Sequence, residues 1–304
     1  MDVARGQSPV LVAAFSALGS TPNEASAAII CRSPRPVNGR LGADRLRHEP
    51  AWNGPAPAWP SATETATLRL MCGRFTQRPT SEMAAIFSAV DRLDDADSYF
   101  NVAPTQRIAV VVERPERERA IVGYRWGLVP SWTKGTARIP ERMFNARAET
   151  VAARPIFRGL LAKHRLIVPA DGFYEWRHGA GGSRQPYYIR RVDGRPLALA
   201  GLWASWHDPD APEDVHEPLR SATILTTQPN ALLGQIHDRM PVILAEFDWD
   251  DWLDPNLTDP TSVLPLLGPA AADLLEAIPV GPRVNSARNQ GPELVEPVGP
   301  ALAV

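Results

Sequence analysis

Eight short runs of β-branched and aromatic residues, separated by Pro, Gly and charged turns, constrain the fold of this chain more than any other feature. They are RIAVVVE (107–113), RAIVGYRWGLV (119–129), HRLIVPA (164–170), GFYEWR (172–177), PYYIRR (186–191), PLALAGLW (196–203), SATILTT (221–227) and PVILA (241–245). Such runs are typical of strands. Helical patterns lie between them without regular alternation, so we expect an α+β fold with a curved, barrel-like mixed sheet and flanking short helices.

The predicted helices are short. In residues 80–90, Thr80 or Ser81 can cap the N-terminus, and apolar residues follow at helical spacing. Further helices are predicted at 145–153, 155–164, 228–236, 245–253 and 270–278. The stretch HGAGGSRQP (178–186) predicts a hairpin loop, because it lacks the spacing of glycines that binds phosphates.

Residues 1–70 differ from the rest of the chain. Pro, Ala, Ser and Arg dominate there, and neither helical nor strand periodicity is sustained. We expect a disordered leader; the alternative is that it is untranslated, because the start codon has been placed too far upstream, or that it is removed. At the other end, the Pro-broken residues 298–304 are expected to form a flexible tail.

Composition excludes several classes of protein. The net charge is −2 over 304 residues, so no global charge points to nucleic acid or a membrane surface. Only two cysteines are present, which excludes a disulfide framework and a CxxC zinc pattern. No run approaches the roughly 18 apolar residues of a membrane span. We expect a cytoplasmic monomer with no metal, no cofactor and no membrane partner.

Three stretches contain candidate catalytic residues. Cys72 follows Met71 directly and precedes a glycine that allows close approach of a ligand, although a lone cysteine is more often a small buried hydrophobe. Glu175 shares one face of its predicted strand with Phe173, so it is expected among apolar neighbours. Burial raises the pKa of a carboxyl group and makes it a proton donor near neutrality, although a carboxylate paired with arginine is the alternative.

His237 in IHDRMP has the side chain best suited to proton transfer at neutral pH, while a structural role is the commoner one. Asn145, Arg147 and Glu149 form an unusual polar alternation in FNARAET, whose alternative is a helix cap and a solvated turn.

The segment from residue 120 to 177 is locally basic. It holds ten basic and four acidic residues together with eight aromatic ones, among them Trp126. Arginine for phosphates and aromatic faces for bases are what single-stranded nucleic acid binding requires. The alternative is that arginines cover a sheet surface and the aromatic residues fill the core.

Six motifs occur in a characteristic order: MCGRF (71–75), WGLVPSW (126–132), FNARAET (144–150), VPADGFYEW (168–176), HDRMPVIL (237–244) and VNSARNQGPELVEP (284–297). Together they resemble the SRAP family, the SOS response-associated peptidases that process abasic sites in the response to DNA damage. The resemblance covers residues 71–297 and implies a SRAP domain there.

The resemblance also implies the partner and the site. The partner is single-stranded DNA with abasic sites, so the protein is expected at the nucleoid when bound. Cys72, Asn145, Glu175 and His237 take the catalytic positions. The DNA-contacting positions fall on Arg74, Arg147 and Arg239, with Arg154, Arg158 and Trp126 as further contacts.

Family members lose the initiator methionine, and the exposed cysteine then links covalently to the sugar aldehyde. An α-amine has a pKa of roughly 7.7–8.0, so it is far more often neutral than a lysine amine. A thiolate beside the resulting imine can close a thiazolidine ring. With the residues upstream of Cys72 attached, this amine is an amide. We therefore expect the functional chain to begin at Met71 and to be trimmed to Cys72. The alternative is that autoproteolysis cuts the bond between Met71 and Cys72.

Two other classes of function remain open. One is a thiol peptidase or autopeptidase in which Cys72 acts with Glu175 and His237. The other is a non-covalent binding module for single-stranded DNA that uses the arginine-rich segment.

Overall fold

The structure is a computed structural model that describes residues 73–78, 81–93, 99–114, 118–135, 143–211 and 217–303, all within one unit of the chain, Ala51–Val304. The leader 1–70, Met71 and the candidate nucleophile Cys72 lie outside these residues, as does the proposed cap Thr80. The expectations on them therefore stay predictions.

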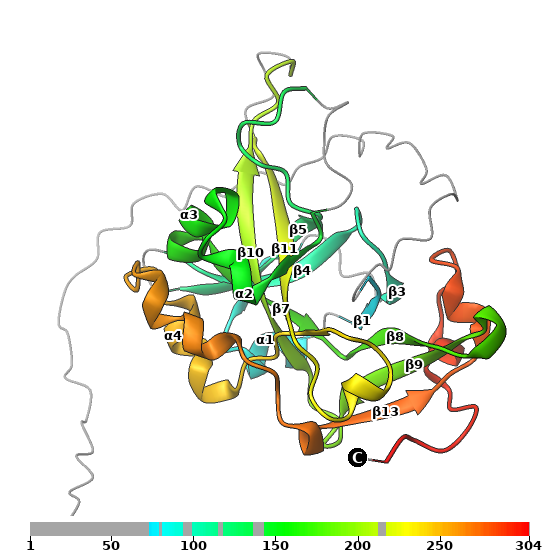
Figure 1. Ribbon diagram of the computed structural model, residues 1–304. Helices are drawn as coiled ribbons and strands as arrows, with labels where there is room; N and C mark the ends of the chain where they lie inside the picture. The colour runs from blue at the N-terminus through cyan, green and yellow to red at the C-terminus, as the bar shows by residue number, and fades with distance from the viewer. Residues whose placement is uncertain are drawn as a thin grey trace, which may run out of the picture. The chain divides into compact units, whose positions relative to one another are not determined.

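An eight-stranded sheet contains the barrel (Figure 1). Its strands, in spatial order, are β12 (Met240–Pro241), β11 (Leu219–Thr227), β10 (Leu197–Trp206), β7 (Arg165–Ala170), β4 (Arg107–Glu113), β5 (Arg119–Trp126) and β2 (Val90–Asp91), and β6 (Asn145–Arg147) pairs with β11. A parallel pairing of β11 with β5 closes β11, β10, β7, β4 and β5 into a five-stranded barrel. The remaining barrel pairs are antiparallel. The predicted mixed, barrel-like sheet is confirmed.

A second, antiparallel sheet has five strands in the order β13 (Leu275–Pro279), β9 (Arg184–Arg191), β8 (Gly172–His178), β1 (Phe75–Gln77) and β3 (Tyr99–Val102). The predicted hairpin over residues 178–186 joins β8 to β9. Gly172 lies where β8 meets its neighbours closely, because a Cβ atom there would come within 2.5 Å of the Tyr188 ring. The glycine therefore allows β1 and β9 to lie on either side of β8.

The helices are short, as predicted. The α-helices are α1 (Ser81–Ile86), α2 (Ala148–Val151), α3 (Pro155–Lys163) and α4 (Trp249–Leu253). The 3-10 helices are η2 (Ala180–Gly182), η3 (Leu233–Gln235), η4 (Glu246–Asp248), η5 (Pro260–Ser262), η6 (Leu264–Leu267), η7 (Ala272–Leu274), η8 (Pro282–Asn285) and η9 (Pro292–Val295). None of the helices in the described ranges has the length and apolar character that crossing a bilayer needs.

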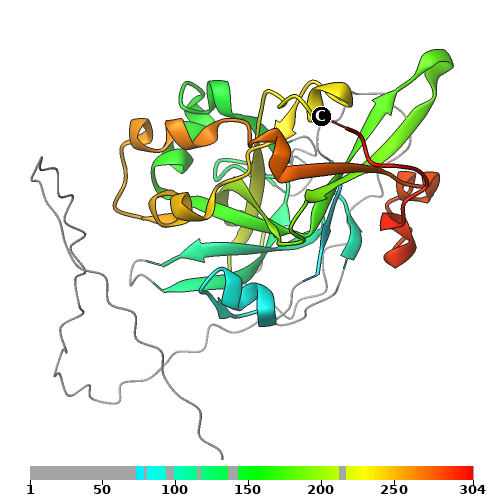
Figure 2. The same ribbon diagram turned by 90° about the horizontal axis from the view of Figure 1, so that it is seen from below.

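Both faces of the eight-stranded sheet are covered, which explains why a run such as RIAVVVE is almost continuously apolar. Along β4, Ile108 and Val110 pack with Phe75 and Phe173 of the five-stranded sheet. Ala109 and Val111, on the opposite face, belong to the cluster that contains the buried side chains of α1, α3 and α4. Figure 2 shows α3 and α4 on the side of the molecule away from the β8–β9 hairpin.

Three predicted helices were wrong over most of their length. In residues 228–236 only η3 is helical. Residues 145–153 divide into strand β6 and the short helix α2, because β11 offers its edge to residues 145–147. In residues 270–278 only η7 is helical, and the rest is strand β13, paired with β9. In the predicted tail, the backbone N–H groups of Val298 and Leu302 donate hydrogen bonds to the carbonyls of Pro279 and Ala277 of β13, both at 2.9 Å.

Candidate functional site

Glu175 lies in the middle of β8 and is buried, with 1% of its surface exposed. The alternation of β8 explains this burial: Phe173, on the same face, belongs to the main core cluster, while Tyr174 packs on the other face with Tyr188. The predicted burial of this carboxyl group is confirmed. The glutamates of the surface ion pairs, Glu118 and Glu276, are more exposed.

The N-terminal strand β1 lies beside the strand of Glu175. Phe75 pairs with Phe173 and Thr76 with Gly172, and the N–H of Tyr174 donates to the carbonyl of Arg74 at 2.9 Å. Continued by one residue, this antiparallel register places Gly73 opposite Glu175. Gly73 is bonded to Cys72, so the chain enters the described part of the molecule next to the buried carboxyl group.

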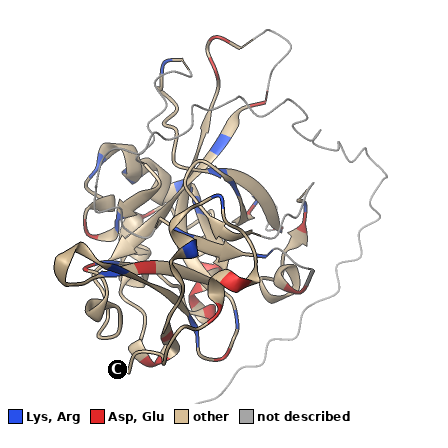
Figure 3. Cartoon of the chain, turned by 90° about the vertical axis from the view of Figure 1, so that its right-hand side faces the viewer, with Lys and Arg blue, Asp and Glu red and all other residues tan. Residues whose placement is uncertain are grey.

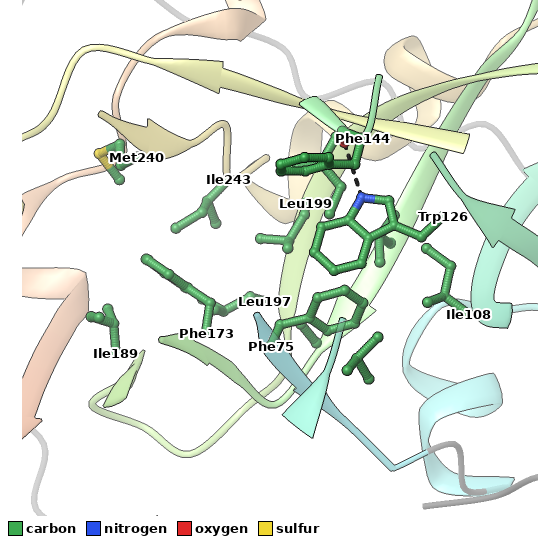
Figure 4. Close-up of a cluster of buried hydrophobic side chains, with 14 of the residues drawn as sticks. Phe75, Ile108, Trp126, Phe144, Phe173, Ile189, Leu197, Leu199, Met240 and Ile243 are labelled. Atoms are coloured by element: carbon green, nitrogen blue, oxygen red, sulfur yellow. Dashed lines mark hydrogen bonds between the residues drawn. The ribbon is translucent and has the colours of Figure 1, made fainter. Parts of the chain in front are cut away.

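Asn145 begins β6, where it pairs in parallel with Ile224 of β11. The carbonyl of the preceding Phe144 accepts two hydrogen bonds, from the N–H of Ile224 and from the indole N–H of Trp126, both at 2.9 Å. Figure 4 shows this indole bond.

Trp126 does not fit the prediction of a DNA contact. Its side chain is fully buried and packs against Phe75 and Phe144, with ring centroids 4.9 and 5.8 Å away (Figure 4). In this structure a nucleic-acid base has no access to it, because the ring is part of the core. This is the alternative in which aromatic residues fill the interior.

His237 follows η3, and its side chain is 10% exposed. Its Nδ1 accepts a hydrogen bond from the backbone N–H of Arg239 at 3.1 Å, and it also lies 3.0 Å from Oδ1 of Asp238. The two contacts require different protonation of Nδ1. In the neutral ring we favour the backbone bond, because the backbone donor is held in place while the Asp238 side chain is 73% exposed. Nε2 then carries the proton and is the available donor.

Arg239 joins this loop to the FNARAET motif. Its guanidinium donates to both carboxylate oxygens of Glu149, at 2.6 and 2.8 Å, and to the carbonyl of Thr226 at 2.6 Å. These bonds hold the pKa of Glu149 below its ordinary value of 4.5. Arg147 is exposed and pairs with Thr226 through the backbone, so both arginines lie at the same end of β11.

The candidate catalytic residues follow or flank members of one core cluster. Phe144 precedes Asn145, Ile236 precedes His237, and Phe173 lies two residues before Glu175. Phe75, from the strand that follows Cys72, is also in this cluster. Residues next to the candidate catalytic positions therefore contribute to the same core cluster from four distant segments of the chain.

Arg74 is partly buried, and burial lowers the pKa of its guanidinium. Its Nη1 donates to Oδ1 of Asn101 and to the carbonyl of Val284, each at 3.1 Å. A fixed arginine two residues after Cys72 is compatible with contact to a phosphate. It also has a structural role, because it bonds Asn101 and Val284.

Arg154 and Arg158 belong to a different region. Both are exposed on or next to α3, whose buried residues Phe157 and Leu161 belong to the helix-side cluster. Arg158 lines an open hollow of about 550 Å³ with Ala153, Pro155, Gly159, Ala162, Thr258 and Pro260. The hollow beside Arg158 is lined by residues of α3 and its flanks and of the loop at Thr258 and Pro260, and none of the candidate catalytic residues is among them.

Fewer arginines of the basic segment 120–177 are available to bind a ligand than its composition suggests. Arg125 and Arg165 are 7% and 5% exposed and donate to backbone carbonyls, while Arg138 and Arg142 lie outside the described residues. Figure 3 shows residues of both charge signs on the face that it presents. Among the described residues, no three His, Cys, Asp or Glu side chains are grouped so that they could hold a metal ion.

Three residues near the site were missed by sequence reasoning: Asn101, Asn285 and Gln290. Asn101 is fully buried and accepts the bond from Arg74, Asn285 Oδ1 accepts from the indole of Trp176 at 2.7 Å, and Gln290 binds the backbone of Asn101. Asn285 and Gln290 lie in the motif VNSARNQG. This motif contributed to the family resemblance, but none of its residues was given a role, and it was the sequence signal that could have identified them.

Comparison with known proteins gives consistent results. The model of the family described as SOS response associated peptidase (SRAP) matches residues 71–287. The abasic site processing protein YoqW of Bacillus subtilis is 40% identical over 229 residues, covering 74% of this chain and 99% of that protein. YedK of Escherichia coli, named likewise, is 30% identical over 235 residues, covering 75% and 100%.

A vertebrate relative and a solved structure agree. The abasic site processing protein HMCES of Gallus gallus is 34% identical over 206 residues, covering 60% of this chain and 58% of that protein. A crystal structure of a protein from Bacteroides thetaiotaomicron superposes with a TM-score of 0.66 at 26% identity, covering 75% of this chain and all of that one.

Proposed function

Because this chain belongs to the SRAP family of SOS response associated peptidases, we propose that it processes abasic sites in single-stranded DNA by covalent capture through Cys72. The observation that carries the proposal is the register of β1 on β8, in which the residue after Cys72 falls opposite the buried Glu175. The names of the relatives supply the substrate class.

The proposed reaction begins when the α-amine of a chain that starts at Cys72 attacks the aldehyde carbon of the opened sugar. Loss of one water gives an imine, and addition of the Cys72 thiol to its carbon closes a five-membered thiazolidine ring. No oxidant or reductant is needed. Glu175 transfers protons during loss of water and in the reverse reaction, and its burial suits a carboxyl group that must be protonated in one step and ionised in the next.

The other residues hold the substrate. His237, with its proton on Nε2, donates to the sugar oxygen. Asn145 orients the amine. Arg74, Arg147 and Arg239 bind phosphates, and Arg239 exchanges its bonds to Glu149 for a phosphate when DNA binds. An abasic nucleotide has no base to unstack, which eases its entry.

Two findings support a functional chain that starts at Cys72. The SRAP match begins at residue 71, and the aligned 229 residues of YoqW cover 99% of that protein but 74% of this chain. With residues 1–70 attached, the nitrogen of Cys72 is an amide and cannot form the imine. The full-length chain should therefore form no stable adduct, and removal of Met71 or autoproteolysis before Cys72 would be the activating step.

The test compares protein that begins at Cys72 with the full-length chain. Each is incubated with single-stranded DNA that contains one abasic site, or with the same strand intact, and products are separated under denaturing conditions. We expect an adduct only from the Cys72-initiated protein with the abasic strand, and Cys72→Ser should lose it while strand binding remains. A stable adduct from the Cys72→Ser variant would contradict the assigned nucleophile.

The proton-transfer role is tested by Glu175→Gln, which should slow formation or reversal of the adduct about 100-fold with little change in strand affinity. The matched control is Glu276→Gln, a partly exposed glutamate on β13 that pairs with Arg190. Equal rates for the two variants would remove the role assigned to Glu175. Salt-sensitive binding to both strands without any adduct would favour the binding module, and cleavage of peptides by the full-length chain would favour the peptidase.

A further inference from the structure

Asn101 lies on β3 and is fully buried, yet all its polar groups have partners. Its Nδ2 lies within hydrogen-bond distance of the carbonyls of Val284, Ser286 and Asn289, at 3.2, 2.9 and 3.3 Å. Its backbone N–H donates to Oε1 of Gln290 at 3.1 Å, and its carbonyl accepts from Nε2 of Gln290 at 3.2 Å. The residue therefore fixes the segment from Val284 to Gln290.

The remaining group of Asn101, its side-chain oxygen, accepts from Nη1 of Arg74 at 3.1 Å, and the same Nη1 donates to Val284. The side chain of Arg74 is thus held by Asn101 and the C-terminal segment, while its backbone carbonyl is held by Tyr174 of β8. Gly73 has no side chain that could be held. Arg74 is therefore the first side chain after Cys72 that can anchor the start of the chain.

The C-terminal segment also contacts the strand of Glu175. Oδ1 of Asn285 accepts from the indole N–H of Trp176 at 2.7 Å, one residue beyond Glu175. The segment therefore contacts both Arg74, two residues after Cys72, and Trp176, one residue after Glu175. Figure 2 shows it, in red, beside the β8–β9 hairpin.

We infer that Asn101 is a positioning residue for covalent capture: by fixing the segment Val284–Gln290 and the Arg74 guanidinium, it holds the start of the chain against β8. The inference rests on the proposed function. A nucleophile reacts quickly only when it is held about 3–3.5 Å from the carbon that it attacks. A chain terminus frays unless it is anchored. Without Asn101, the Arg74 guanidinium loses the hydrogen bond to the Asn101 side chain. It also loses the support of the segment Val284–Gln290, which Asn101 fixes and which supplies its other acceptors.

The test uses Asn101→Leu in protein that begins at Cys72, with Gln77→Leu as the matched control. Gln77 is also a buried amide, on β1 itself, and it bridges Ala109 and Pro169 by hydrogen bonds of 2.6–2.9 Å without touching Arg74. Both variants lose a buried amide, so a general loss of stability affects both. Asn101→Ser, which keeps one donor, is measured as well, in case the leucine variant does not fold.

We expect Asn101→Leu to lower the maximal rate of adduct formation at saturating abasic strand by about tenfold or more, with Asn101→Ser in between. Affinity for the intact strand should change less than about threefold in both, because Arg74 is one of several cations, and Gln77→Leu should keep the wild-type rate. Equal rate losses in Asn101→Leu and Gln77→Leu, or a loss confined to affinity, would overturn the inference.

A second readout separates this inference from the proposed function. Hydrogen exchange of the Tyr174 amide reports whether Arg74 stays docked on β8, since that amide donates to its carbonyl. Exchange should accelerate in the Asn101 variants and not in Gln77→Leu. If wild-type protein forms no adduct, the proposed function fails while exchange still tests the positioning; if adducts form and Tyr174 exchange is unchanged in Asn101→Leu, the positioning role fails alone.

Discussion

Arg165 shows how backbone carbonyls can hold a buried charged side chain, which is 5% exposed. Its guanidinium donates to five backbone carbonyls, those of Leu161, Ala162, Trp252, Asp254 and Leu257, at distances of 2.5–3.1 Å. These carbonyls include the C-terminal end of α3 and the end of α4, which have no partners within their own helices. Burial lowers the pKa of this arginine, and the carbonyl dipoles compensate for its lost hydration.

We predict that Arg165→Met lowers the free energy of unfolding by about 3 kcal/mol or more, because it leaves buried carbonyls without donors. Arg190→Met, which removes an exposed ion pair with Glu276, is the control and should cost less than about 1 kcal/mol. Urea unfolding of both variants checks the prediction. Similar midpoints for the two would show that Arg165 does not hold the helix ends.

The ion pair between Glu149 and Arg239 should make the stability of the fold depend on pH. Hydrogen bonds from Arg239 lower the pKa of Glu149 in the folded protein below the ordinary 4.5, so the folded state binds this proton less readily than the unfolded chain. The ionised pair therefore stabilises the fold above about pH 4.5, and this contribution is lost as the pH falls through the lowered pKa. The difference in Tm between wild type and Glu149→Gln should be largest near pH 7 and shrink below pH 4; a constant difference would contradict the assignment.

At the residue scale, burial of Glu175 was predictable from the sequence, because strand alternation assigns it to the face of Phe173. The role of Asn101 was not predictable, since its partners in the C-terminal segment are 183–189 residues away along the chain and no local pattern shows them. Trp126 was predicted wrongly for a related reason: composition indicates that arginines and aromatic residues are plentiful, but only packing decides which of them are exposed.

At the element scale, runs of β-branched residues predicted strands well. Segments rich in Ala, Leu and Glu were wrongly predicted to be helices. Residues 270–278 have high helix propensity, yet Leu275 and Ala277 are buried, Glu276 between them is partly exposed, and all three pair with β9. The edge of the five-stranded sheet offers more hydrogen bonds and burial than a lone helical turn. Tertiary pairing therefore overrides propensity in this segment.

The C-terminal residues 298–303 yield a prediction at the same scale. Leu302 packs on the main core cluster and donates to Ala277, and the Ala303 carbonyl accepts from Gln235 of η3 at 3.0 Å. We expect Leu302→Ser to lower the free energy of unfolding by about 1–2 kcal/mol. Val298→Ser is the control and should change it by less than about 0.5 kcal/mol, because Val298 is 63% exposed. Equal unfolding midpoints would restore the expectation of a flexible tail.

At the scale of the whole molecule, the barrel depends on one strand pairing that no local sequence pattern predicts. Ser221 and Ala222 of β11 pair in parallel with Arg125 and Trp126 of β5, almost one hundred residues earlier, and this pairing closes the ring of strands. Continuing along β11, β6 is added in the same direction and places Asn145 and Arg147 near the His237 loop. Barrel closure and placement of the site are therefore linked.

The sequence by itself determined the family, the fold class, most strands and the identity of the candidate catalytic residues, because residue type, short-range periodicity and ordered motifs are local properties that can be read along the chain. Only the tertiary structure decided which arginines are buried, that Trp126 belongs to the core, that the C-terminal residues bond to β13, and that Asn101 joins Arg74 to the segment Val284–Gln290. These depend on which distant segments exclude water from one another, and burial is a property of the packed molecule rather than of any stretch of it.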